Sequence, residues 1–311
     1  MSSNKVIQCV ISTVLLTSVV LNMTACYIIL FKVKKKEITH LLIVSISITN
    51  LLETTIGLTP QLLMANEFSL ERTPLCIVSG FAVLSFAITN ITQLTILSFI
   101  RTVAIKYPLQ FLRYNKMFWC RATLILVCYA NGFFWAILPI IGWSKYELDL
   151  DKKRCSLNWR LTKLNSFSYI LSIFICCNIL PGIAIALTLY FSKKTIYRRR
   201  GRKICQSRET GFLEKEYLRV CLLSTITFFF FWSFYALFSV LTLLKIVIPT
   251  NLATTSALFA KLSTISNVLI NCYAIKSFRK QLLDIWVIQF MKKCCWVLTA
   301  CKKSSVNDQI S

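Results

Sequence analysis

Long apolar runs dominate this chain and recur seven times along it. Each run has about 20 or more residues, the length that an α-helix needs to cross about 30 Å of hydrocarbon. The runs lie near residues 6–31, 40–64, 76–100, 119–141, 166–191, 218–244 and 252–275. The pattern predicts an all-α membrane protein built as a bundle of seven transmembrane helices.

Nothing in the sequence separates these runs into several domains. The 7 Gly and 6 Pro are scattered, with no repeat and no low-complexity segment. The first run begins near Val6 and is too long for the core of a signal peptide, so we expect it to be retained as a span. We therefore expect one membrane domain over residues 1–290 and a tail over 291–311.

Composition and charge agree with a lipid environment. Hydrophobic residues make up 56% of the chain and charged residues only 15%, against about a quarter in soluble domains. Most Lys and Arg fall in the loops of one side, including the run from Arg198 to Lys203. Cytoplasmic loops carry such an excess, which predicts an extracellular N-terminus and a cytoplasmic C-terminus. A basic loop beside anionic lipid requires no nucleic-acid partner.

The chemistry-bearing residues point to neither a metal site nor an enzyme. The 14 Cys are scattered, mostly inside apolar runs, and do not have metal-ligand spacing. We find no catalytic triad and no phosphate-binding loop. We therefore expect a protein that is not an enzyme and holds no metal.

One basic residue, Lys261, lies inside the seventh apolar run. It is about 12 Å from either end at about 1.5 Å per residue, too deep to reach water easily. An ammonium group there costs on the order of 3 kcal/mol, which favours a functional lysine over a stray charge. It could pair with an acid, bind an anion, or form a Schiff base with an aldehyde in a dry cavity.

The surroundings of Lys261 resemble the seventh-helix motif of opsins, in the rhodopsin-like receptor family. The stretch Leu258-Phe-Ala-Lys-Leu-Ser-Thr-Ile-Ser-Asn267 carries this likeness. Further positions fall in opsin register: Asn22, Cys76, Arg101, Tyr107-Pro108-Leu109, Cys155, Pro181, Phe228, Trp232, Tyr235 and Ser277-Phe278-Arg279-Lys280. The resemblance extends from about residue 20 to 290, and it is to a divergent opsin rather than a vertebrate visual one.

The resemblance implies a light receptor with retinal, 11-cis or all-trans, bound covalently to Lys261 as a Schiff base. It also implies a disulfide between Cys76 and Cys155, a lid from the second outer loop, and a short amphipathic eighth helix beginning near Ser277. The expected pocket residues are Val83, Leu84, Ala87, Leu157, Phe174, Asn178, Phe228, Trp232 and Tyr235.

A protonated imine in an apolar pocket needs a nearby anion to keep its proton. Ser79 stands where vertebrate visual opsins have a glutamate, so that arrangement is excluded. Glu53 in the second span and Asp149 in the second outer loop remain as counterion candidates, and the sequence does not decide between them.

At the cytoplasmic side the resemblance assigns G-protein coupling to Arg101, with arrestin and a receptor kinase as further partners. The family's acid before this arginine is replaced by Ile100. Cys294 and Cys295 resemble palmitoylation sites that hold the tail to membrane lipid. The expected location is the plasma membrane.

Two other functions stay open. The first is a receptor for a small ligand in which Lys261 forms an internal salt bridge with Glu53. The second is a transporter that uses both residues as a polar relay. Transporters usually have internal repeats and broken helices, and we find neither in the sequence.

Overall fold

The computed structural model describes residues 3–33, 36–63, 74–149, 154–159, 161, 165–201, 208–246, 249–274 and 279–280. Its helices are α1 (Ser3–Tyr27), η1 (Ile28–Lys32), α2 (Ile38–Leu63), α4 (Pro74–Lys106), α5 (Pro108–Lys116), α6 (Phe118–Ile137), α7 (Ser166–Ile173), η2 (Phe174–Ile179), α8 (Leu180–Gly201), α9 (Arg208–Leu243) and α10 (Thr250–Ala274). Two short strands, β1 (Tyr146–Leu148) and β2 (Cys155–Leu157), lie between α6 and α7.

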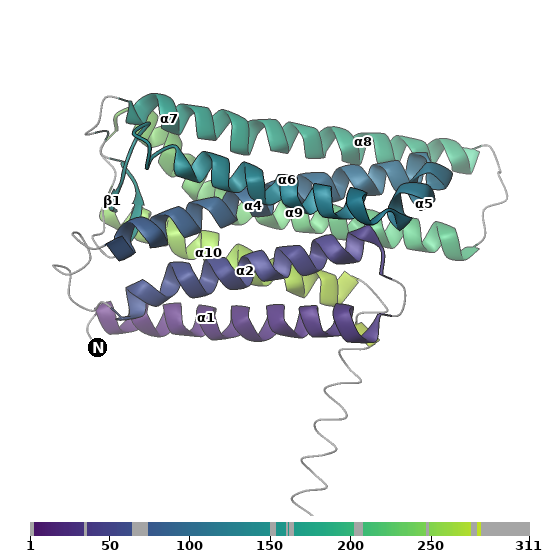
Figure 1. The fold of residues 1–311 in the computed structure, drawn as a ribbon, viewed down its shortest axis with the longest axis horizontal. Coiled ribbons are helices and arrows are strands. Elements are labelled where there is room, and N and C mark those ends of the chain that lie inside the picture. The colour runs from purple at the N-terminus through teal and green to yellow at the C-terminus, as the bar shows by residue number, and fades with distance from the viewer. Residues whose placement is uncertain are drawn as a thin grey trace, which may run out of the picture.

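The long helices lie side by side as one bundle (Figure 1), and they coincide with the seven apolar runs. The fifth run is covered by the continuous series α7, η2 and α8. Among the described residues, six of these helical segments are long and apolar enough to cross a membrane. The seventh, α10, is not in that set, and it carries many Ser, Thr and Asn residues. The prediction of an integral membrane bundle is confirmed.

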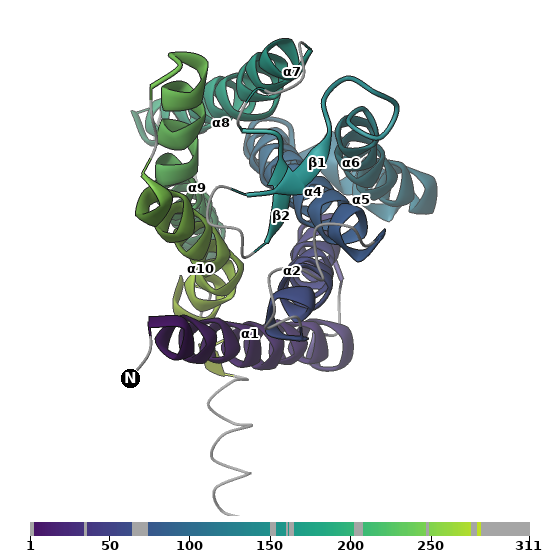
Figure 2. The same cartoon turned by 90° about the vertical axis from the view of Figure 1, so that its left-hand side faces the viewer.

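Helix α4 occupies the middle of the bundle and packs against α2, α6 and α8. It approaches α6 closely at Gly132, where an added Cβ would collide with Thr89 and the carbonyl oxygen of Ser85. A side chain at Gly132 would therefore force the two helices apart. At the other side of the bundle, α10 packs against α9 and α1, which closes the ring of helices (Figure 2).

The strands form an antiparallel hairpin across one end of the bundle (Figure 2). Tyr146 pairs with Leu157 and Leu148 pairs with Cys155. A disulfide joins Cys155 to Cys76 at the start of α4, which confirms the predicted bond. The hairpin also rests on α4 through the Tyr146 ring, which lies 2.8 Å from where a Cβ on Gly80 would be. The second loop is thereby fixed as a lid over the helices.

Several predictions fall outside the described residues. They are most of the eighth helix, of which only Arg279 and Lys280 are described, the two cysteines Cys294 and Cys295, and the tail over 291–311.

Candidate functional site

Two adjoining cavities lie beneath the hairpin, with empty volumes of about 790 and 610 Å³. Their shared wall consists of Leu84, Ala87, Leu157, Trp232 and Tyr235. The first cavity includes Lys261 and Glu53 at one side, and the second continues toward α7 and η2. Most of the lining is aliphatic or aromatic, as is usual for sites that bind small apolar molecules.

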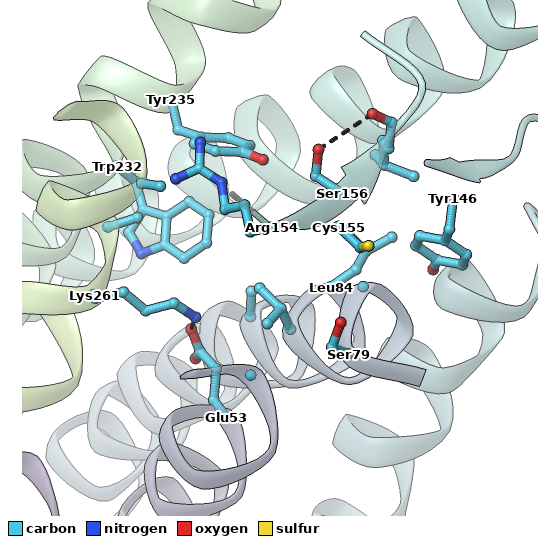
Figure 3. Close-up of a pocket in the computed structure, with 17 residues that line it drawn as sticks. Glu53, Ser79, Leu84, Tyr146, Arg154, Cys155, Ser156, Trp232, Tyr235 and Lys261 are labelled. Carbon is cyan, nitrogen blue, oxygen red and sulfur yellow. Dashed lines mark hydrogen bonds and ion pairs between the residues drawn. The ribbon is translucent and has the colours of Figure 1, made fainter. Parts of the chain in front are cut away.

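Lys261 and Glu53 form a buried ion pair at the wall of the first cavity (Figure 3). Nζ of Lys261 donates to Oε1 of Glu53 over 2.9 Å, and the two side chains are 9% and 1% exposed. The sequence-based hypothesis of mutual pairing thus agrees with the geometry. A buried charge without a partner would be costly, so each residue makes the position of the other tolerable.

Gly57 gives Lys261 the space to reach this acid. It lies on α2 one turn after Glu53, and an added Cβ would collide with Val83 and lie 3.6 Å from Nζ of Lys261. We infer that a side chain at Gly57 would displace either α4 or the lysine. Sequence reasoning did not find this role, because an isolated glycine in an apolar run carries no signal of what it touches.

Asp149, the second counterion candidate, is engaged elsewhere. Its Oδ2 accepts from Nε of Arg154 at 2.7 Å and pairs with Nη2 of the same arginine at 2.5 Å. Nη2 of Arg154 also donates to the carbonyl oxygen of Ala253 on α10, at 2.7 Å. The geometry therefore brings Glu53, and not Asp149, to Lys261.

Arg154 is a cavity residue that the sequence analysis missed. It lines the first cavity together with Tyr235 and Trp232 (Figure 3). It also links the hairpin to the beginning of α10, because its two partners belong to those segments. The signal available in the sequence was its position directly before Cys155, in the loop expected to form the lid.

Every residue predicted for the pocket lies at one of the two cavities. Val83 lines the first cavity; Phe174, Asn178 and Phe228 line the second; Leu84, Ala87, Leu157, Trp232 and Tyr235 line both. Trp159, which was not predicted, closes the second cavity with its ring 5.4 Å from that of Tyr235. Nε1 of Trp232 donates to Ser263 on α10 over 3.2 Å, which fixes the indole at the shared wall.

Arg101 is buried near the C-terminal end of α4. The adjacent Thr102 connects α4 to α8 through neutral groups. Its Oγ1 lies 2.8 Å from Oγ of Ser192 and donates to the carbonyl oxygen of Thr188 over 3.1 Å. These hydrogen bonds hold the two helices together beside Arg101, where the sequence has Ile100 in place of the family's acid.

Comparison with known proteins decides the family. The model of the family described as 7 transmembrane receptor (rhodopsin family) matches residues 21–274. The chain belongs to this family. The match covers every helix that contributes to the cavities, and the family is one of receptors rather than enzymes.

The curated relatives of this receptor include several opsins, which confirms its resemblance to a divergent opsin. Opsin-VA of Rutilus rutilus is 29% identical over 215 residues, which cover 68% of the receptor and 55% of that relative. Pinopsin of Gallus gallus is 28% identical over 274 residues, covering 86% and 76%. Opsin-3 of Mus musculus is 26% identical over 281 residues, covering 86% and 66%. The receptor thus spans between about half and three quarters of these relatives.

The fold is also similar to that of a solved structure. The crystal structure of squid rhodopsin matches with a TM-score of 0.79 at 19% sequence identity, covering 94% of this receptor and 87% of the squid chain. This match confirms the predicted seven-helix fold.

Proposed function

We propose that this receptor is a light sensor that carries retinal on Lys261 as a Schiff base. One observation carries the proposal: a lysine amine buried inside the bundle borders an apolar cavity and has a carboxylate 2.9 Å away. Condensation of that amine with an aldehyde releases one water molecule and leaves an imine nitrogen in the same place. The opsin relatives support the choice of aldehyde.

The cavity walls fit a long apolar molecule attached at Lys261. The two adjoining cavities extend from the lysine past Trp232 and Tyr235 toward Phe174. When bound, retinal supplies a light-driven change in the geometry of one double bond. The aromatic side chains then provide surfaces that distinguish the two shapes, and a difference in contact energy between them is what shifts the helices between states.

Glu53 serves in this proposal as the counterion. Its carboxylate is almost completely buried and faces the nitrogen that becomes the imine. A nearby anion keeps a proton on such a nitrogen, and the protonated form absorbs visible light. Arg154 neutralises Asp149, so that acid contributes little to the field at Lys261.

Our proposal for G-protein coupling is based on the receptor family to which the chain belongs. Light would open the face of the bundle near Arg101 to a heterotrimeric G-protein, and arrestin and a receptor kinase would bind the same face afterwards. The many basic residues on the loops of that side support our proposal that it is cytoplasmic and that the N-terminus lies outside the cell. We propose the plasma membrane as the location.

The test is to express the full chain, add 11-cis retinal and record the absorbance spectrum. We expect a visible band, and reduction with borohydride should fix the retinoid to the peptide that contains Lys261. Lys261→Ala should abolish both signals. Lys106→Ala, which removes an exposed lysine at the end of α4, is the matched control and should retain both.

A receptor for a small diffusible ligand is the second candidate. It is favoured by the fact that Lys261 already has a complete ion pair with Glu53. A wild-type protein that folds but stays colourless and unmodified, in the visible and the near ultraviolet, would refute light sensing and favour this alternative.

A further inference from the structure

The side chain of Arg154 forms part of the roof of the first cavity, at the tip of the hairpin. The carbonyl oxygen of Arg154 accepts from the amide of Asp149 over 2.9 Å, so the two residues face each other where the strands end. The Arg154 side chain lines the cavity and is 13% exposed, against 1% for that of Asp149. Arg154 therefore lies between the cavity and the solvent at the hairpin end of the bundle (Figure 3).

The backbone of Arg154 is held close to α4, because the next residue is part of the disulfide. Cys155 is joined to Cys76 at the start of α4. Tyr146 attaches the hairpin to α6 as well, where its hydroxyl group donates to the carbonyl oxygen of Ala136 over 2.7 Å. The long side chain of Arg154 can change its rotamer while the backbone stays attached. It is therefore the movable part of this section of the roof.

The guanidinium group reaches from the hairpin to α10. Nη2 of Arg154 donates to the carbonyl oxygen of Ala253 over 2.7 Å. Ala257 follows about one helical turn later and lines the same cavity, and Lys261 follows after another turn. The contact with Ala253 is thus about 12 Å from Lys261 along α10, at about 1.5 Å per residue. The Arg154 side chain spans the mouth of the cavity above Lys261.

Asp149 holds this side chain in place. Its Oδ2 contacts both Nε and Nη2 of Arg154, at 2.7 and 2.5 Å. Two contacts to one planar guanidinium group fix its direction more closely than a single one does. Because the carboxylate of Asp149 is buried, withdrawal of the guanidinium group would leave a buried charge without its partner. The position that spans the mouth is therefore the favoured one.

We propose that Arg154 is a gate residue, which in its closed position keeps water and water-borne solutes away from Nζ of Lys261. A change of rotamer breaks the hydrogen bond to Ala253 and opens the mouth of the cavity. Hydrolysis of an imine on Lys261 consumes one water molecule, so the closed gate preserves a bound aldehyde. This last consequence rests on the proposed function, whereas the gate itself does not require it.

The experiment measures how fast Lys261 reacts with a small polar aldehyde in the full-length receptor without retinal. Glycolaldehyde is neutral and very soluble in water, so it approaches the cavity from the solvent rather than through lipid. It condenses with the amine with loss of one water molecule. Cyanoborohydride then delivers hydride to the imine carbon, and the nitrogen retains a proton from solvent. Mass spectrometry of peptides follows the resulting hydroxyethyl group on Lys261 with time.

The test variant combines Asp149→Asn with Arg154→Gln, and Asp149→Asn alone is its reference. Neither chain contains the buried carboxylate, so they differ only in the proposed gate. Lys261 should be labelled about 10- to 100-fold faster in the double variant, because the closed position has lost a hydrogen bond from a charged group. Lys106, which is exposed at the end of α4, should react equally fast in both.

Lys145→Gln is the matched control. Lys145 precedes β1 in the same hairpin and pairs with Glu147 over 2.8 Å, but it lies outside the described lining of the first cavity. This change should leave the labelling rate of Lys261 at the wild-type value. If the double variant does not fold, Arg154→Met replaces Arg154→Gln in it. Equal rates in the double variant and its reference, or an equal acceleration in Lys145→Gln, overturn the proposal.

Addition of 11-cis retinal separates the two proposals. A colourless wild type, together with faster labelling in the double variant, refutes light sensing and retains the gate. A coloured wild type with equal labelling rates refutes the gate and retains light sensing. When both proposals hold, hydroxylamine should bleach the double variant in the dark faster than Asp149→Asn, and equal bleaching rates would count against the gate.

Discussion

Nζ of Lys261 lies 2.9 Å from Oε1 of Glu53, although 208 positions separate the two residues in the sequence. The pair joins α10 to α2 at the wall of the cavity, where neither charge has ready access to water. Removing one partner leaves the other as a lone buried charge, which proteins tolerate poorly. The chemistry of Lys261 therefore depends on the state of Glu53.

Replacement of the two acids should give opposite results in the pigment. Glu53→Gln should lose visible absorbance at neutral pH and absorb in the near ultraviolet, because the imine no longer has a buried anion beside it. Asp149→Asn should keep its visible band, because that acid already pairs with Arg154. Absorbance spectra of the two variants and of the wild type show which acid is the counterion. A visible band that survives in Glu53→Gln and disappears in Asp149→Asn would reverse the assignment.

The ion pair between Asp149 and Arg154 should show strong coupling in thermal unfolding. The side chains are only 1% and 13% exposed, so Arg154→Gln leaves a buried carboxylate without its partner. We expect this change to cost about 3–5 kcal/mol of stability. Combining it with Asp149→Asn should cost less than Arg154→Gln alone. Independent effects that simply add in the double variant would contradict the coupling.

Gly57 should tolerate a side chain only if Val83 becomes smaller. Gly57→Ala places a methyl group against Val83 and near Nζ of Lys261, and overpacking of this kind costs about 1–3 kcal/mol. Thermal unfolding should show this loss, and the visible band should shift as the ion pair moves. Val83→Ala in the same chain provides the missing space. It should restore most of the lost stability and return the visible band most of the way to its wild-type position. The prediction is wrong if the double variant is no better than Gly57→Ala.

Tyr146 should stabilise the folded protein, and this stabilisation should decrease at alkaline pH. Burial of the Tyr146 ring between the hairpin and α4 raises the pKa of its hydroxyl group above the ordinary value, which is about 10. The folded state therefore disfavours the phenolate, and the resulting stability is complete below about pH 10 and is lost as the pH rises further.

Tyr146→Phe provides the comparison. It loses the 2.7 Å hydrogen bond to the carbonyl oxygen of Ala136, worth about 1 kcal/mol. Melting temperatures of the wild type and of this variant, measured on either side of pH 10, should converge as the pH increases. A constant difference would show that the hydroxyl has the same pKa in the folded and unfolded states, which contradicts the prediction.

The sequence alone determined the helices, the family resemblance and the disulfide. Lipid requires about 20 apolar residues in each span, and this requirement is local enough to read from the chain. The seven runs were located within a few residues, although α4, α8 and α9 continue beyond the predicted ends. The same reasoning identified Lys261, because a charge at the centre of an apolar run is conspicuous without any knowledge of its neighbours.

Only the tertiary structure distinguished Glu53 from Asp149. Both are acids at plausible positions, and the choice depends on where Arg154 lies, which no local pattern reveals. The role of Gly57 was likewise invisible, because an isolated glycine gains meaning only from side chains on other helices. A buried charge or amide is satisfied by partners that the packing of the bundle brings together. The packing of four helices against one another therefore forms the site, whereas each helix by itself is determined by its own residues.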